Sequence, residues 1–463
     1  MMNTTDLSRL PVYAEAEVVV CGGGTAGAFA AIAAAREGRD TLLIEQFGTL
    51  GGTATVGLTT PLMHSHIDGN PHCSYIYPLL QEKLLPTGGV NPEGNRFDPL
   101  LLGVALEQLC VESGVRLLYH TFIPEVVMEN DAVSAVVIAN KAGLSLVKGK
   151  VFIDATGDGD ISVRAGAAYN KGNPETGKNQ PISLRYIVDN VDFPALGEFF
   201  RETAERTGIH RNASVGPGEA EMYADCCKSL PPTTLTAVFE EAIENGDLTV
   251  EDHLYWQAFC LTGRPGSIAF NCPEFFDRVD GTNPEDLTLA QVNGKKAALR
   301  QLAFYKKYFK GFEKAYIAEI AGMVGIRESR EIVTDYVLTA EDIWLKRKFD
   351  DMFCQCNYPI DIHGVILQNR YLTETPDNER PWYDIPFRSL LVKGVENLFV
   401  TGRCMGTEFA AEASSRIQIN ARSSGEAAGI GAAIALRDGI SIHEVNGADV
   451  REVMASKGAE YAK

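Results

Sequence analysis

Three glycines near the start of the 463-residue chain, Gly22, Gly24 and Gly27, have the spacing GxGxxG. They follow a short apolar run, 17–21, and precede an alanine-rich stretch, 25–37, so they mark a predicted turn from a strand into a helix. The first glycine permits the tight turn, the second lets a pyrophosphate approach the backbone, and the third lets the helix pack against the strand. Free N–H groups at the start of the helix favour phosphate. The spacing therefore predicts a dinucleotide-binding turn.

Glu45 ends the next predicted strand, 40–44, at about 20 residues from the glycines. A carboxylate at this spacing lies against the ribose of an adenosine. It also disfavours the 2′-phosphate of NADP. We therefore expect residues 17–45 to form one strand–helix–strand unit that binds FAD or NAD.

The segment that follows favours FAD over NAD. Three short runs, 125–129, 133–140 and 144–148, predict an antiparallel β-meander, whereas an NAD domain usually continues with another helix and strand. The meander leads into a further strand, 151–154, and then into Ala155-Thr156-Gly157. That arrangement resembles flavoproteins with two dinucleotide-binding domains, in which an ATG segment packs near the dinucleotide.

The end of the chain supports the same cofactor. A predicted strand, 398–401, ends at Gly402-Arg403, and a helix with small residues along one side is expected over 415–436. In such flavoproteins the last helix points its N-terminus at the flavin pyrimidine, where the helix dipole stabilises negative charge on the reduced ring. Taken alone, the pattern fits a core strand and a packed helix equally well.

Six motifs in order make the resemblance specific. The chain resembles the FAD-dependent oxidoreductase family through GGGxAG, GxLGGxxT, DATGDGD, GIRESR, YDIPxRSL and NLxVxGR, and the match runs from about residue 17 to about residue 436. The segment 404–409 departs from the family's CISxTHEA-like sequence and lacks its histidine. The residues that we expect to contact FAD are Gly22, Gly24, Thr25, Ala26, Gly27, Glu45, Gln46, Gly51, Gly52, Thr53, Ile123, Ala155, Thr156, Gly157, Gly402, Arg403, Arg416 and Ile417.

The predicted fold class is α/β, with a Rossmann-like FAD-binding domain (a parallel sheet plus a β-meander) and a second, mixed α+β substrate domain. The FAD-binding domain is expected to be discontinuous, over 1–60, 100–165 and 390–445. The substrate domain would take 61–99 and 166–389, and 446–463 would form a C-terminal tail. Within the second domain, helices are expected over 235–245, 287–310 and 312–320, and strands over 183–188 and 267–271.

Hydride transfer from a carbon that bears OH or NH requires a base for the heteroatom proton, and the reverse reaction requires an acid. His64 follows the glycine loop and is expected near the flavin; His363 lies in a DxH-like segment that resembles one in many relatives. Arg327 and Arg330, in GIRESR, could bind a carboxylate or stabilise an oxyanion. Three of the four have a structural alternative: loop hydrogen bonds for His64, and ion pairs with neighbouring glutamates for the two arginines.

The composition excludes several other classes of protein. The chain has 42 Lys and Arg against 61 Asp and Glu, a formal net charge of −19, and nucleic-acid binding requires a basic footprint. Its longest apolar stretches are about half the roughly 20 residues of a membrane span, and no secretory signal is seen, so we expect a cytoplasmic protein without a membrane span. The 10 cysteines show no paired spacing that predicts disulfides or a metal site, and no metal is expected.

The function expected from these features is FAD-dependent hydride transfer between a small organic substrate and flavin N5. No second strand–GxGxxG–helix unit and no CxxxxC dithiol are present, so electrons are expected to come from the substrate or to pass through an external donor or acceptor. The alternatives are a C=C reductase of the fumarate-reductase type and a flavin-binding regulatory protein without turnover. A homo-oligomer is compatible with the sequence, which does not determine the oligomeric state.

Overall fold

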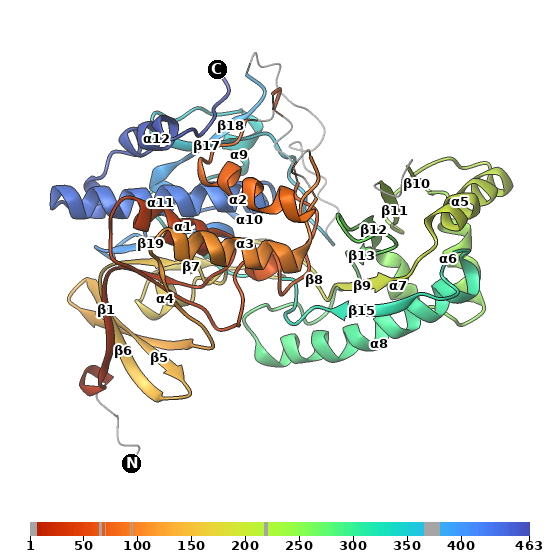
Figure 1. Ribbon diagram of the computed structural model, residues 1–463, viewed down its shortest axis with the longest axis horizontal. Helices are drawn as coiled ribbons and strands as arrows, with labels where there is room; N and C mark the ends of the chain where they lie inside the picture. Colours follow the sequence, from red (N-terminus) through yellow and green to blue (C-terminus); the bar gives the residue numbers. More distant parts are fainter. Residues whose placement is uncertain are drawn as a thin grey trace.

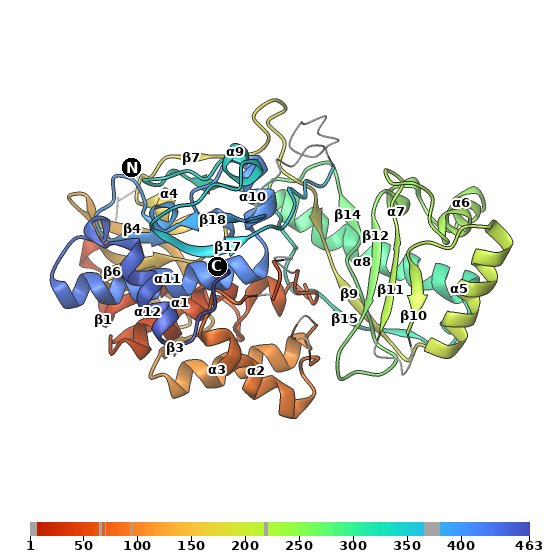
Figure 2. The ribbon, with the colours of Figure 1, turned by 90° about the horizontal axis from the view of Figure 1, so that it is seen from above.

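The computed structural model describes residues 7–63, 67–69, 71–92, 94, 96–216, 221–364 and 380–463. The chain forms two lobes (Figure 1). The first lobe contains the N-terminal strands and the C-terminal helices, and the second lobe, residues 186–320, lies to one side of it in both views (Figure 2).

The first lobe is built on a seven-stranded sheet with the order β3-β2-β1-β6-β5-β4, in which β19 also pairs with β6. The pairs β1–β2, β2–β3, β1–β6 and β6–β19 are parallel, and β4–β5 and β5–β6 are antiparallel. The strands are β1 (Val12–Cys21), β2 (Thr41–Ile44), β3 (Arg116–Leu118), β4 (Phe122–Glu129), β5 (Ala132–Asn140), β6 (Gly143–Asp154) and β19 (Leu398–Val400). This sheet confirms the predicted α/β class, with a parallel sheet and a meander.

Strand β6 differs from the expectation of two separate runs. It continues through Gly149, which pairs with Ala16 of β1. A Cβ on Gly149 would lie 2.8 Å from Cγ2 of Val19, so the glycine serves close packing rather than a turn. One strand therefore closes the meander and also enters the parallel sheet.

The two helices α1 (Thr25–Arg36) and α11 (Gln418–Asp438) pack against each other along the sheet (Figure 1). Small residues allow their backbones to approach, because a Cβ on Gly429 would lie 2.3 Å from the carbonyl oxygen of Ala30. The predicted helix over 415–436 is divided at Arg416 and Ile417 into α10 (Phe409–Ser415) and α11. The remaining helices of this lobe are α2 (Ile76–Leu84), α3 (Pro99–Glu112), α4 (Asp160–Arg164), α9 (Ala340–Trp344) and α12 (Gly447–Ser456).

Short strand pairs complete the first lobe and connect it to the second. They are β7 (Tyr169–Asn170) with β16 (Glu331–Ile332), β8 (Ile182–Ser183) with β14 (Glu274–Phe275), and β17 (Met352–Cys356) with β18 (Tyr383–Pro386).

The second lobe contains a six-stranded sheet with the order β10-β11-β12-β13-β9-β15, in which every pair is antiparallel. One face packs against the lobe's helices around Trp256, Phe270 and Tyr305. The predicted helix over 312–320 is wrong, because β15 pairs with β9 there. The elements are β9 (Tyr186–Asp189), β10 (Ala213–Val215), β11 (Met222–Cys226), β12 (Trp256–Cys260), β13 (Ile268–Phe270), β15 (Tyr316–Ile320), α5 (Phe193–Thr207), α6 (Thr236–Glu244), α7 (Val250–Leu254) and α8 (Pro284–Tyr308).

Candidate active site

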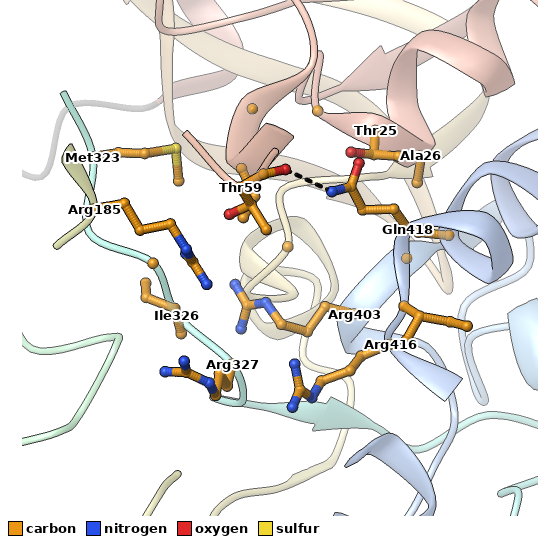
Figure 3. A pocket seen from close by; sticks show the side chains of 18 of the residues that line it. Thr25, Ala26, Thr59, Arg185, Met323, Ile326, Arg327, Arg403, Arg416 and Gln418 are labelled. Carbon is orange, nitrogen blue, oxygen red and sulfur yellow. Dashed lines mark hydrogen bonds between the residues drawn. The ribbon is translucent and has the colours of Figure 1, made fainter. Parts of the chain in front are cut away.

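A cavity of about 710 Å³ lies between the two lobes and takes lining residues from both. Its volume is within the usual range for ligand sites, about 300–1,000 Å³. Figure 3 shows side chains from distant parts of the chain, among them Thr25, Arg185 and Arg416, around the same space. The predicted FAD residues that line it are Gly22, Gly24, Thr25, Ala26, Glu45, Gln46, Gly52, Thr53, Ile123, Ala155, Thr156, Gly157, Gly402, Arg403, Arg416 and Ile417.

The turn between β1 and α1 uses its three glycines in different ways. Gly22 has a φ of 98°, and its Cβ would lie 2.5 Å from the carbonyl oxygen of Ala155. A Cβ on Gly27 would lie 1.8 Å from the carbonyl oxygen of Gly22, so Gly27 packs behind the turn and does not line the cavity. Gly24 lines the cavity, and its Cβ position has no atom within 4 Å. Its bare backbone is therefore open to a ligand.

Gly51 was expected to touch the cofactor but lies behind the cavity lining. Its N–H donates to the carbonyl oxygen of Gly23 at 2.8 Å, and its φ is 100°. The residue thus fixes the glycine turn to the following loop, while Gly52 and Thr53 lie on the cavity surface.

Glu45 is buried at the end of β2 and lines the cavity. Its Oε2 accepts from the backbone N–H of Gly23 at 2.6 Å, and its Oε1 accepts from that of Phe47 at 2.8 Å. Burial raises the pKa of Glu45, although these backbone hydrogen bonds act in the opposite direction. Each carboxylate oxygen has a further lone pair, so the side chain can still accept hydrogen bonds from a diol.

The N-terminus of α11 borders the same cavity. Its cap residue Ile417 lines the cavity, and Gln418 Nε2 donates to the carbonyl oxygen of Thr59 at 2.9 Å (Figure 3). Nearby, the backbone N–H of Gly402 donates to Ser424 Oγ at 2.9 Å. A helix N-terminus stabilises negative charge through its free N–H groups and its dipole.

Arg403 and Arg330 belong to one ion-pair group around the ATG segment. Arg403 lines the cavity and contacts Asp158 at 2.8 Å. Arg330 pairs with Asp160 at 3.0 Å and is absent from the cavity lining. The structure therefore gives Arg330 an ion pair rather than a place beside a substrate.

Arg327 and His363 both reach the cavity lining and share one buried carboxylate, that of Glu274. Arg327 Nη2 forms a very short ion pair with Glu274 Oε1, and His363 Nδ1 lies 3.1 Å from the same oxygen. His363 Nε2 lies 3.5 Å from Oδ2 of Asp361. Burial opposes ionisation of Asp361, but the adjacent imidazole of His363 and the charges of the arginines around it lower its pKa. His64 lies outside the described residues.

The second lobe supplies a polar surface that the sequence reasoning missed. Tyr223 and Asp225 of β11 line the cavity, as do Gln257 of β12 and Tyr255 just before it. The residues between them pack into the core of the lobe, for example Trp256. This period-two alternation is the expected pattern for a sheet with one buried face, and it was the available sequence signal.

Arg185, immediately before β9, was also missed. It is 8% exposed and lines the cavity, and its Nε donates to Oδ1 of Asn271 at 2.8 Å. Burial, with the nearby charge of Arg327, lowers the pKa of Arg185 to about 9. Figure 3 shows its guanidinium directed into the same space as those of Arg403, Arg327 and Arg416.

The chemistry of the first-lobe surface fits FAD. The bare backbone at Gly24 and the free N–H groups at the start of α1 suit a pyrophosphate. Glu45 offers acceptors for ribose hydroxyls, and the N-terminus of α11 offers donors at the far end. Within the described part of the chain, the buried hydroxyl of Thr401, which also lines the cavity, has no hydrogen-bond partner, as expected for a group that meets a ligand.

The comparisons agree with this geometry. The chain matches the family model of the FAD dependent oxidoreductases over residues 17–454 and therefore belongs to that family. It is an enzyme with FAD as its cofactor, as the motifs predicted. No curated protein matches the chain.

Three solved structures illustrate its neighbours. A geranylgeranyl bacteriochlorophyll reductase-like protein from Thermoplasma acidophilum is 14% identical, with a TM-score of 0.46 over 96% of this chain and 84% of that one. The myxobacterial chondrochloren halogenase CndH is 12% identical, with a TM-score of 0.46 over 95% and 78%. L-proline dehydrogenase from P. horikoshii is 13% identical, with a TM-score of 0.44 over 96% and 99%. These similarities carry no argument about the reaction.

Among the residues described, no group of three or more His, Cys, Asp or Glu is arranged to hold a metal ion. In the same part of the chain, no helix combines the length and apolarity that crossing a bilayer requires.

Proposed function

We propose that the protein catalyses hydride transfer between a carbon of a small organic substrate and N5 of FAD. The observation that carries this proposal is the cavity itself, which has a dinucleotide-type surface on the first lobe and polar side chains, among them Asp225, Gln257 and Asn271, on the second. A substrate on the second-lobe surface would face the cofactor across the cavity. Bound FAD supplies the acceptor for the electron pair.

The first lobe would hold the cofactor along its length. The turn at Gly24 and the start of α1 would bind the pyrophosphate, and Glu45 would bind the adenosine ribose. Gly52 and Thr53 would contact the chain between pyrophosphate and flavin, and the N-terminus of α11 would lie at the flavin end. All of these residues line the cavity.

His363 is proposed to move the heteroatom proton. His363 lies beside two carboxylates, with Nδ1 3.1 Å from Glu274 Oε1 and Nε2 3.5 Å from Asp361 Oδ2. The tautomer with its proton on Nδ1 would leave Nε2 as the basic nitrogen. In an oxidation, the substrate C–H hydrogen leaves as hydride and the O–H or N–H proton passes to Nε2, so that a C=O or C=N bond forms. Asp361, 3.5 Å from Nε2, stabilises the imidazolium that results.

The reverse class of reaction, reduction of an activated C=C bond with an arginine as acid, is the second candidate. It is supported by the arginine side chains that line the cavity, Arg185, Arg327, Arg403 and Arg416. A regulatory protein without turnover is disfavoured, because the surface opposite the dinucleotide site is not lined by apolar side chains alone: it includes Asp225, Gln257 and Asn271.

Dye-linked turnover of the purified holoenzyme tests the proposal. Small alcohols, amines, hydroxy acids and amino acids would be assayed for dye reduction, and enoates would be assayed for oxidation of a reduced dye. Reduction of the dye by a substrate with an O–H or N–H beside the reacting carbon supports the proposal. Turnover with enoates alone would favour the reductase, and protein that binds no flavin after reconstitution would refute both. The external electron partner, the oligomeric state and the cellular location stay predictions.

A further inference from the structure

Arg185 stands apart from the other arginines that face the cavity. Arg327 is paired with Glu274, and Arg403 is paired with Asp158. Arg416 lies 3.8 Å from Glu412 and donates to the carbonyl oxygen of Asp361. Within the described residues, Arg185 has no carboxylate in ion-pair range, and its hydrogen bond uses only Nε.

The position of Arg185 is fixed by its neighbours. Asn271 accepts from Nε of Arg185, and its own Nδ2 donates to the Tyr255 hydroxyl at 3.0 Å and to Gln257 Oε1 at 3.1 Å. The backbone at Gly325 leaves room for the guanidinium, since a Cβ there would lie 2.4 Å from Nη1. Held in this way, the two terminal nitrogens of Arg185 remain available to a ligand in the cavity.

The acidic groups on the second-lobe side of the cavity are already engaged. Asp225 accepts from Asn212 Nδ2 at 2.9 Å and from the Tyr223 hydroxyl. Asp361 lies beside His363. A buried guanidinium without a counter-charge is costly, so a bound anion would offset the cost of burying Arg185. The chain's net charge of −19 repels anions at long range, which makes a local cation necessary to retain one.

We propose that the substrate is a small carboxylic acid and that Nη1 and Nη2 of Arg185 bind its carboxylate. This inference rests on the proposed function and names the substrate class. A planar guanidinium matches a carboxylate through two parallel hydrogen bonds. Because Arg185 and His363 both line the cavity, with Tyr255 and Arg327 between them, the reacting carbon would lie near the carboxylate. Arg185 is thus assigned to substrate binding rather than to the proton transfer.

Ligand titration of the holoenzyme tests the assignment without requiring turnover. Acetate, propionate and benzoate would each be titrated against the corresponding amides, with the visible flavin spectrum and isothermal calorimetry as readouts. We expect saturable binding of the carboxylates and at least tenfold weaker binding of the amides. Arg185→Met should weaken carboxylate binding about tenfold or more, and Arg185→Lys should lie between, because an ammonium keeps the charge without the planar pair of donors.

A second variant covers the case in which Arg185→Met does not fold. Asn271→Asp would place a carboxylate against Nε of Arg185, where it supplies an internal counter-charge. We expect this variant to retain FAD and to bind the carboxylates severalfold more weakly. Arg201→Met is the matched control, since Arg201 is exposed on α5 of the same lobe and does not line the cavity.

Several results would overturn the inference. The first is equal binding of carboxylates and amides, and the second is unchanged carboxylate binding in Arg185→Met. The third is loss of FAD rather than of carboxylate binding in Arg185→Met, which would assign the arginine to the cofactor. Inorganic phosphate serves as the competing anion, and tighter binding of phosphate than of every carboxylate would also contradict the assignment. If dye-linked turnover occurs with neutral substrates only, the substrate is not a carboxylic acid, whereas the proposed hydride transfer still holds.

Discussion

Gly425 of α11 lies directly against Ala26 at the start of α1, so that a Cβ on Gly425 would be 2.0 Å from the Ala26 carbonyl oxygen. Two segments about 400 residues apart thus meet backbone to backbone beside the glycine turn. We expect Gly425→Ala to force α1 and α11 apart, to destabilise the protein by about 1–3 kcal/mol and to weaken FAD binding. Thermal unfolding and flavin content after gel filtration measure the two effects.

Gly197 of α5 provides the control for this substitution. It is also a helical glycine, but a Cβ added there would lie 3.3 Å from its nearest atom, the Cβ of Val215 in the second lobe. Replacing it with alanine should change stability little, since the gain in helix propensity of up to about 1 kcal/mol offsets the tighter contact. A Gly425→Ala protein with unchanged stability and flavin content would contradict the close approach of the two helices.

Glu45 leads to a prediction about the cofactor alone. Its two oxygens already accept from Gly23 and Phe47, and we expect them also to accept from the adenosine ribose. Glu45→Gln replaces one acceptor with a donor, which should weaken FAD binding about tenfold or more. Fluorescence titration of the apoprotein with FAD measures the affinity. Glu129→Gln, at the exposed end of β4, is the control. Equal FAD affinity in the two variants would show that Glu45 does not contact the cofactor.

Glu426 makes the stability of the first lobe depend on pH. The side chain lies on α11 and accepts from Ser74 Oγ at 2.6 Å and from the backbone N–H groups of Tyr75 and Ile76 at the start of α2. Burial raises its pKa to about 7, against a smaller opposite effect of these hydrogen bonds. Between the unfolded value of about 4.3 and the folded value, the folded protein therefore holds a proton that the unfolded chain has released.

The stability contributed by Glu426 must fall as pH rises through this window. It is complete below about pH 4 and is lost by about pH 8, a change of up to ~3 kcal/mol in the free energy of unfolding. Glu426→Gln should remove this part of the pH dependence, which urea unfolding at several pH values measures. Glu452→Gln removes an equal charge from the exposed surface of α12 and should leave the slope unchanged. An identical slope in Glu426→Gln and the native protein would contradict the prediction.

The local sequence was sufficient to predict the first-lobe half of the candidate site. The turn at Gly22 to Gly27 depends on backbone freedom that glycine alone provides, and its spacing placed β1, α1 and β2 to within a few residues, except that β1 begins at Val12. Contacts between segments far apart in the chain were harder to predict from the sequence. The segment over 312–320 has apolar residues at intervals that suit either a short helix or a strand, and pairing with β9 decides for the strand.

The second-lobe half of the site could not be assigned from the sequence. The alternation of Tyr255, Trp256 and Gln257 indicates that one face of a strand is buried, but it does not say which face opens to a cavity. That depends on how the lobes meet. The sequence around Arg185 indicates its role even less. Its distinctive property is that it lacks a carboxylate partner among the described residues, and only the folded structure shows which residues lie beside it.

His363 gives the most direct test of the proposed chemistry. Its Nδ1 lies 3.1 Å from Glu274, and its Nε2 is proposed to receive the substrate proton. Since general-base catalysis contributes about 10²–10⁴-fold, His363→Gln should lower kcat by about 100-fold or more with a smaller effect on KM. His210→Gln, on the exposed surface of the second lobe, is the matched control. A native kcat in His363→Gln would assign the proton transfer to another group.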